Sequence, residues 1–240
     1  MNPDLRHFLS RLRHRLATAA APDPLPADTE SVVRQTPPGA DIVETFRAAA
    51  TIAGVVVTLC DETAWPHHAF SALAPRDAAT PRTAATPRDA ATLLIRDTLP
   101  ERLRRRLPEL ERLLASEHIA IARPGDDAEL FAAGATITGV AAAIAETGSL
   151  IWHAGPGAPR AATLVPPLHV AVVAVEQIVP DLHDYLASLS PVVPAPLSAR
   201  TPLPSHLNII TGPSKTADIE GVLVTGVHGP GRVRAILVRT

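Results

Sequence analysis

The sequence predicts an α/β fold, in which a mainly parallel sheet carries helices on both faces. Apolar residues run without alternation through short segments such as 54–59, 168–175 and 234–238, a pattern typical of strands covered on both sides. Helical segments separate these strands along the chain, which is the order that makes neighbouring strands parallel. The chain is 46% hydrophobic but only 3% aromatic, which suits close packing of Ala and Val between helices and a sheet.

Residues 1–40 predict a basic amphipathic arm followed by a proline-rich linker. Residues 1–16 read as a helix whose arginines lie away from one apolar face, formed by Leu5, Phe8, Leu9, Leu12 and Leu16. Residues 21–39 are rich in proline and acidic residues, which indicates an extended segment. The pattern favours an arm that docks on the domain or on a partner subunit over one that binds a membrane surface.

Residues 41–240 predict a single α/β domain. Its first half holds predicted helices at 41–50, 99–116 and 127–133, and predicted strands at 54–59, 93–95 and 118–122. A low-complexity insertion occupies 74–92, where a Pro-Arg-x-Ala-Ala-Thr hexamer occurs three times in tandem. Proline at every sixth residue prevents one long helix, so we interpret this segment as a tolerated surface insertion.

The second half of the domain continues the same alternation. It predicts one or two strands within 135–145, further strands at 150–152, 168–175, 207–210 and 234–238, and a helix at 179–189. Gly212-Pro213 interrupts the chain after 207–210. Ser214 or Thr216 is then expected to cap another helix, with Asp218 and Glu220 in its first turn.

Composition and charge exclude several classes of protein. The one cysteine, Cys60, rules out a disulfide within the chain and any cluster held by several thiolates, and it indicates a reducing cytoplasm. No apolar run is long enough to span a membrane. A net charge of -2 gives no reason to expect nucleic acid.

No common nucleotide-binding motif is present. The chain lacks a G-x-G-x-x-G turn and a Walker A sequence. Residues 212–216 resemble a phosphate loop superficially, but they hold too few glycines. Asp218 and Glu220 would also oppose a phosphate at a helix start.

Glu146 is the acid with the best position for chemistry. It follows an apolar strand, and Thr147 and the Gly148 amide beside it are suited to orient a substrate carbonyl. A purely structural role, in which the carboxylate ties down the next turn, is an equally good interpretation. Because ligands of α/β sheets bind at the carboxyl ends of strands, the Glu146 and Gly212 segments are expected to face one crevice.

Four histidine positions need separate interpretation. His228, in a loop bounded by Gly and Pro, is the second catalytic candidate. His169, inside an apolar strand, is better explained as a core residue. His153 is a minor candidate beside a glycine-rich loop, and the adjacent pair at 67–68 has poor spacing for a metal.

A series of short motifs resembles the signature of the LUD-domain family, in its lactate utilization protein C (LutC/YkgG) group. The motifs are the A-E-T-G-S string at 145–149, Arg160, Pro167 with His169, the I-V-P string at 178–180, the G-P-S-K-T-A-D-I-E string at 212–220 and the G-V-H-G-P string at 226–230. Their order and spacing match from about residue 135 to the C-terminus.

The resemblance implies a fold of the NagB/RpiA/CoA-transferase type and a role in oxidising L-lactate to pyruvate. It implies two partner proteins that carry the iron–sulfur clusters, so no cofactor is expected on this chain and no metal site is predicted. The residues that it marks are Glu146 and His228 as catalytic candidates. For binding a small carboxylate it marks Thr147, Gly148, Ser149, Arg160, Gly212, Ser214, Lys215, Thr216, Asp218 and Glu220.

Two departures from the family pattern matter. Lys215, the only lysine in the chain, stands where the family usually has arginine, so a bidentate grip on a carboxylate becomes a point-charge contact. Ala141 stands where the family commonly has an aspartate.

Two other classes of function remain open: a stand-alone acyl- or CoA-transferase-like enzyme that uses Glu146, and a non-catalytic scaffold subunit. The oligomeric state is also open.

Overall fold

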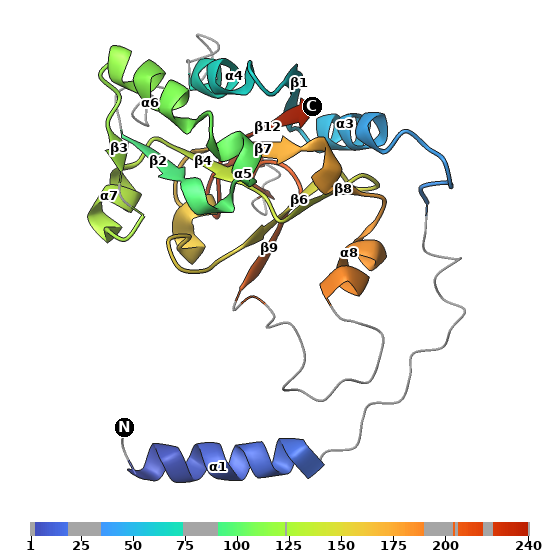
Figure 1. The fold of residues 1–240 in the computed structure, drawn as a ribbon, viewed down its shortest axis with the longest axis vertical. Coiled ribbons are helices and arrows are strands. Elements are labelled where there is room, and N and C mark those ends of the chain that lie inside the picture. Colours follow the sequence, from blue (N-terminus) through green and yellow to red (C-terminus); the bar gives the residue numbers. More distant parts are fainter. Residues whose placement is uncertain are drawn as a thin grey trace. The chain divides into compact units, whose positions relative to one another are not determined.

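The computed structural model describes residues 3–18, 35–73, 91–122, 124–189, 204, 206–217 and 223–239 (Figure 1). The chain divides into two compact units, Met1–Arg34 and Gln35–Thr240. In the first unit, helix α1 spans Pro3–Thr18. Its apolar residues Leu5, Phe8 and Leu12 are exposed, and the role of this helix as an arm stays a prediction.

A six-stranded parallel sheet forms the centre of the second unit. Its strand order is β1-β12-β7-β4-β2-β3, and every neighbouring pair is parallel. The strands are β1 Val56–Asp61, β2 Thr92–Ile95, β3 Ile121–Ala122, β4 Ala135–Gly139, β7 Leu168–Ala174 and β12 Arg232–Arg239. The predicted parallel sheet is confirmed, and Thr92, at the end of the predicted insertion, is already part of β2.

Helices cover one face of this sheet. They are α4 Trp65–Ala72, α5 Glu101–Arg104 and α6 Leu107–Ser116, and their apolar side chains pack on alternate residues of β2, β4, β7 and β12. The single helix predicted at 99–116 is therefore wrong in one respect, because it breaks at Arg105 and Arg106. Pro108 occupies the first turn of α6 and has no N–H to continue a preceding helix.

The opposite face is covered by helices and by a second sheet that the sequence did not predict. Helix α3 Ile42–Ile52 begins at Asp41, whose carboxylate accepts from the amides of Val43 (3.0 Å) and Glu44 (3.1 Å). Helix α7 Asp127–Ala132 packs farther along the same face. The second sheet has the order β8-β5-β6-β9 and comprises β5 Ala142–Ile144, β6 Ser149–His153, β8 Ile178–Val179 and β9 Leu207–Ile210.

The second unit also contains helix α8 and three 3-10 turns. Helix α8 Leu182–Leu189 lies on the outer face of the second sheet and buries Tyr185 there. The 3-10 turns are η1 Arg96–Thr98, η2 Arg160–Thr163 and η3 Val175–Gln177. Among the helices of the described ranges, none is both long enough and apolar enough to cross a membrane.

The helix predicted after Gly212-Pro213 is wrong. Strand β10 Lys215–Ala217 pairs antiparallel with β11 Leu223–Thr225, so the backbone groups of this segment are used between strands. Asp218 and Glu220 lie outside the described residues, as does the repeat up to residue 90.

Candidate functional site

Two of the predicted site segments lie side by side. Three hydroxyls form a continuous chain, in which Ser149 Oγ bonds to both Thr147 Oγ1 and Thr211 Oγ1 at 2.7 Å. Strands β5 and β9 both pair antiparallel with β6. Both strands therefore end beside the first residues of β6, at the same end of the second sheet. As a result, the turn after β5 lies next to the turn after β9.

Two glycines of these segments are required by packing against the end of α3. A β-carbon on Gly148 would lie 2.2 Å from the Ala50 nitrogen, and one on Gly212 would lie 2.3 Å from the Ala53 oxygen. Both residues also have positive φ, at 65° and 87°, a conformation that side chains disfavour. The close backbone packing explains both glycines without a ligand.

Ser214 connects the third predicted segment to the other two. Its amide donates to the Pro230 carbonyl (2.8 Å), and its own carbonyl accepts from the Gly226 amide (2.9 Å). Its hydroxyl accepts from the His228 amide at 3.3 Å. The His228 ring and Lys215 are exposed, and Lys215 Nζ approaches Gly54 at the end of α3, where a cation suits the helix dipole.

The remaining predicted residues are more scattered. Glu146 is half-buried, and its Oε1 accepts from the Gln35 amide at 3.2 Å. Arg160 is exposed at the start of η2. Asp218, Glu220 and the side chain of Thr216 lie outside the described residues. The described residues of the Glu146 and Gly212 segments thus form a packed junction at the end of α3, and neither segment lines the pocket described next.

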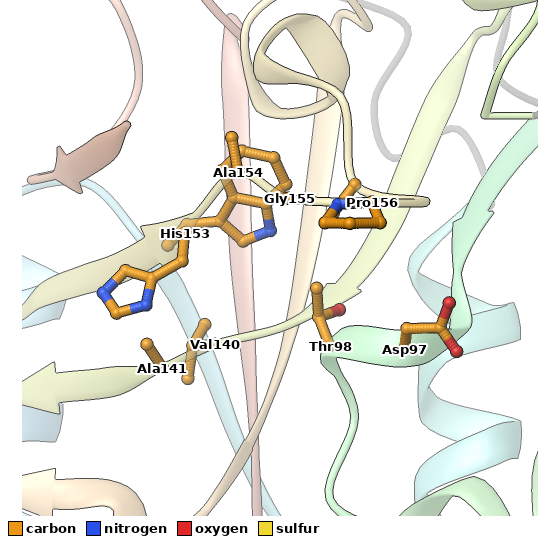
Figure 2. A pocket seen from close by; sticks show the side chains of 10 residues that line it. Asp97, Thr98, Val140, Ala141, His153, Ala154, Gly155 and Pro156 are labelled. Atoms are coloured by element: carbon orange, nitrogen blue, oxygen red, sulfur yellow. The ribbon is translucent and has the colours of Figure 1, made fainter. Parts of the chain in front are cut away.

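A pocket of about 280 Å³ opens at the carboxyl ends of β2 and β4 (Figure 2). It is lined by Asp97, Thr98, Val140, Ala141, Trp152, His153, Ala154, Gly155, Pro156 and Ala158. Beyond β2 the chain turns toward β3 at one edge of the sheet, and beyond β4 it turns into the second sheet and on to β7. Neighbouring parallel strands whose connections diverge in this way leave a crevice in which α/β proteins bind ligands.

Thr98 and Gly139 hold the two strand ends together at this pocket. The Thr98 hydroxyl donates to the Ile95 carbonyl (2.9 Å) and accepts from the Gly139 amide (2.8 Å). A β-carbon on Gly139 would lie 2.1 Å from the backbone carbonyl oxygen of Thr98. The pocket floor therefore depends on the absence of a side chain at Gly139.

His153 is the principal ionisable group at one end of the pocket. Its Nε2 shares a hydrogen bond with the Tyr185 hydroxyl on α8, and the centroids of the two rings lie 6.2 Å apart. Burial lowers the pKa of His153 below its usual value and raises that of Tyr185. Both groups are therefore neutral at neutral pH.

Two further groups complete the polar lining. The Trp152 side chain is fully buried, and its Nε1 has no hydrogen-bond partner within the described ranges. Asp97 is exposed, and its carboxylate is directed away from His153 (Figure 2). The described residues contain no group of three or more His, Cys, Asp and Glu side chains placed to hold a metal.

The interpretation of His169 as a core residue is confirmed. The ring is fully buried in β7, and its Nε2 bonds to Thr138 Oγ1 at 2.9 Å. Burial lowers its pKa to about 4. Cys60 is also buried, and burial together with the charge of Asp61 raises its thiol pKa to about 11.

Sequence reasoning missed most of the pocket. Of its lining residues, His153 was a minor candidate and Ala141 was noted only as a departure from a family pattern. Asp97 and Thr98 lie between the predicted strand at 93–95 and the predicted helix at 99–116, a position that could have marked them as candidates. Tyr185 is separated from His153 by 32 positions, and no local pattern connects them.

Fold and pocket together define an α/β protein with a small pocket between diverging strands of a parallel sheet. The LUD-domain family model matches residues 43–238. The chain therefore belongs to the LUD-domain family, as the motifs indicated. A crystal structure of a DUF162 family protein from Deinococcus radiodurans has the same fold, with a TM-score of 0.52 and 23% identity over 82% of this chain and 96% of that one.

Several curated relatives carry the name lactate utilization protein C. The chain is 40% identical over 116 residues to the one from Deinococcus radiodurans, which is 48% of this chain and 51% of the relative. It is 37% identical over 102 residues to the one from an Exiguobacterium strain, 42% and 43% of the two chains. It is 36% identical over 95 residues to the one from Bacillus subtilis, and these residues are 40% of this chain and 38% of the relative. The matches thus span about half of these relatives or less.

Proposed function

We propose that this chain acts in lactate utilization, as a component of a cytoplasmic system that oxidises L-lactate to pyruvate. The observation that carries the proposal is the set of relatives named lactate utilization protein C, together with the family match across 43–238. The pocket at the ends of β2 and β4 supports it, because about 280 Å³ is ample for a three-carbon acid.

The electrons of this reaction go to iron–sulfur partner proteins in our proposal. Conversion of L-lactate to pyruvate releases two electrons and two protons. A cluster held by four thiolates needs four cysteines, and this chain has only Cys60. That thiol is buried in β1 with a pKa of about 11, which keeps it neutral and a poor ligand.

The transferase-like alternative loses support from the position of Glu146. A carboxylate that acts as a nucleophile needs a free oxygen facing a substrate. Glu146 does not line the described pocket, and one of its two carboxylate oxygens, Oε1, is engaged by the Gln35 amide. The scaffold alternative makes a different prediction, because a scaffold has no need of the pocket.

Growth on L-lactate tests the role, and purification tests the partners. Deletion of the gene is expected to abolish growth on L-lactate while leaving growth on pyruvate intact, and re-expression of the chain should restore it. Purification of the chain from lactate-grown cells should recover proteins that contain iron–sulfur clusters. Unchanged growth of the deletion strain on L-lactate would refute the role. Full complementation by a chain whose pocket is blocked, for example by Ala141→Trp, would favour the scaffold.

A further inference from the structure

His153 and Tyr185 form a pair whose protonation can be deduced from their surroundings. Tyr185 is 4% exposed, and within the described ranges its hydroxyl meets no partner besides His153 Nε2. A buried hydroxyl proton without an acceptor costs free energy. The phenol therefore donates its proton to Nε2, because the opposite arrangement would leave that proton unpaired.

The other ring nitrogen of His153 must then carry the imidazole proton. A neutral imidazole has one N–H and one acceptor nitrogen, and His153 is neutral at pH 7 because burial lowers its pKa. With Nε2 accepting, Nδ1 is the donor. In Figure 2 the ring nitrogen next to the side-chain stem faces Ala141, which also lines the pocket. The pocket is thus presented with an N–H group and not with a base.

We propose that this pocket binds a small 2-oxo or 2-hydroxy monocarboxylate through a hydrogen bond from His153 Nδ1–H to a ligand oxygen, with Tyr185 holding the ring in that tautomer. The choice of ligand class rests on the proposed function in lactate utilization. His153 binds the ligand in this proposal, and Tyr185 is a positioning residue.

Two features of the pocket agree with a ligand that accepts hydrogen bonds. Trp152 lines the pocket with its fully buried indole, whose N–H has no acceptor among the described residues. The Asp97 carboxylate is directed away from His153 (Figure 2), so among the described lining residues none puts an anion at the end of the pocket near His153. Since none of the described side chains that line the pocket is a Lys or Arg, the described donors are neutral, and we expect an affinity in the millimolar range.

Nuclear magnetic resonance of the imidazole nitrogens tests the tautomer directly. In the uniformly ¹⁵N-labelled full chain at pH 7.5, His153 is expected to be protonated at Nδ1. Addition of sodium pyruvate or sodium L-lactate is expected to shift the His153 signals and to leave those of the exposed His183 unchanged. A proton on Nε2, or no response of His153 to either acid, would overturn the proposal.

Variants distinguish the hydrogen bond that His153 donates from the packing of its ring. Tyr185→Phe frees Nε2, so we expect a mixture of tautomers and about fivefold weaker pyruvate binding. His153→Asn keeps an N–H near the Nδ1 position and should bind within about threefold of the wild type, whereas His153→Phe should abolish binding. His183→Asn, on the same helix as Tyr185, is the matched control. Equal binding by the Phe and Asn variants at position 153 would contradict the assigned role.

The binding test and the growth test can fail independently. If the deletion strain grows normally on L-lactate while pyruvate still perturbs His153, the proposed function is wrong and the pocket assignment stands. If growth is lost but neither acid perturbs His153 in the purified chain, the function stands and the pocket assignment is wrong.

Discussion

Ala141 lines the same pocket as His153, whose ring points toward it in Figure 2, and a single substitution there tests the electrostatics of the pocket. An aspartate at this position would put an anion beside Nδ1–H (Figure 2). Burial lowers the pKa of His153 in the wild type, and a carboxylate within about 4–6 Å stabilises the charged imidazolium. Ala141→Asp is therefore expected to raise the pKa of His153 by about one unit or more, measured by its chemical shift against pH.

The neutral variant Ala141→Asn controls for size at the same position. It should leave the His153 titration close to that of the wild type, because it adds volume without charge. Pyruvate binding should weaken in the aspartate variant more than in the asparagine variant, since like charges repel. Indistinguishable titrations of Asp and Asn variants would show that position 141 does not face the imidazole.

His169 gives a second prediction at the residue scale, this time for stability. The folded chain holds it neutral, with a pKa of about 4 against the ordinary 6.5. Between these values the unfolded chain binds more protons, so stability rises with pH across this window and falls as pH drops through it. From pH 7 to pH 5 the contribution lost is about 2 kcal/mol.

Urea unfolding of the wild type and of His169→Gln at both pH values measures that loss. Glutamine retains an amide that can bond to Thr138 but does not titrate, so its stability should fall by about 2 kcal/mol less than that of the wild type. The difference between the two proteins cancels the contribution of the carboxylates that both share. An equal pH dependence would mean that His169 is protonated in the folded state or is not buried.

At the scale of the elements, the contact between β2 and β4 determines the pocket floor. A β-carbon on Gly139 would lie 2.1 Å from a backbone oxygen of Thr98, and a backbone atom cannot move away as a flexible side chain can. Gly139→Ala should destabilise the chain by about 2 kcal/mol and weaken pyruvate binding. Gly125→Ala is the matched control, because nothing lies within 4 Å of its added carbon. Similar thermal midpoints for both variants would argue against this close contact.

The elements also show what the sequence could predict. Continuous apolar runs located the strands β1, β7 and β12, and burial on both faces explains the run most fully for β7, in which every residue is buried. The segment after Gly212 was mistaken for a helix, because Ser214 and Thr216 suit a cap as well as a strand. Its conformation depends on pairing with Leu223–Thr225, and partner strands are not visible in a local pattern. The second sheet was missed for the same reason, since β8 and β9 reach β5 and β6 from distant parts of the chain.

At the scale of the whole molecule, the sequence motifs and the pocket lie in different parts of the fold. The motif at 145–149 and the described part of the 212–220 motif meet around the end of α3, where Gly148 and Gly212 are required by packing. The pocket instead combines loops after β2, β4 and β6 that carry small, unremarkable residues such as Val140 and Ala154. The sequence could therefore predict that the Glu146 and Gly212 segments are neighbours. The pocket follows only from the strand order, which no single segment specifies.

The division of the chain into two units leads to the last prediction. Residues from Gln35 onward belong to the second unit, held there by bonds from the Gln35 amide to Glu146 (3.2 Å) and from the Thr36 hydroxyl to the Pro180 carbonyl (3.5 Å). A chain that starts at Gln35 keeps these bonds and every described strand of the three sheets. We expect its thermal midpoint to lie within about 2 °C of the full chain, with unchanged pyruvate binding.

Helix α1 should instead matter for assembly. Its exposed apolar face, with Phe8 at 61% and Leu12 at 42% exposure, is the kind of surface that a partner covers. Removal of residues 1–34 is therefore expected to reduce co-purification of the iron–sulfur partners, and Phe8→Ser with Leu12→Ser in the full chain should have the same effect. Arg6→Gln changes the polar face and should reduce it less. If all of these proteins recovered the same partners, the arm would not be the docking element, and assembly would depend on the α/β unit alone.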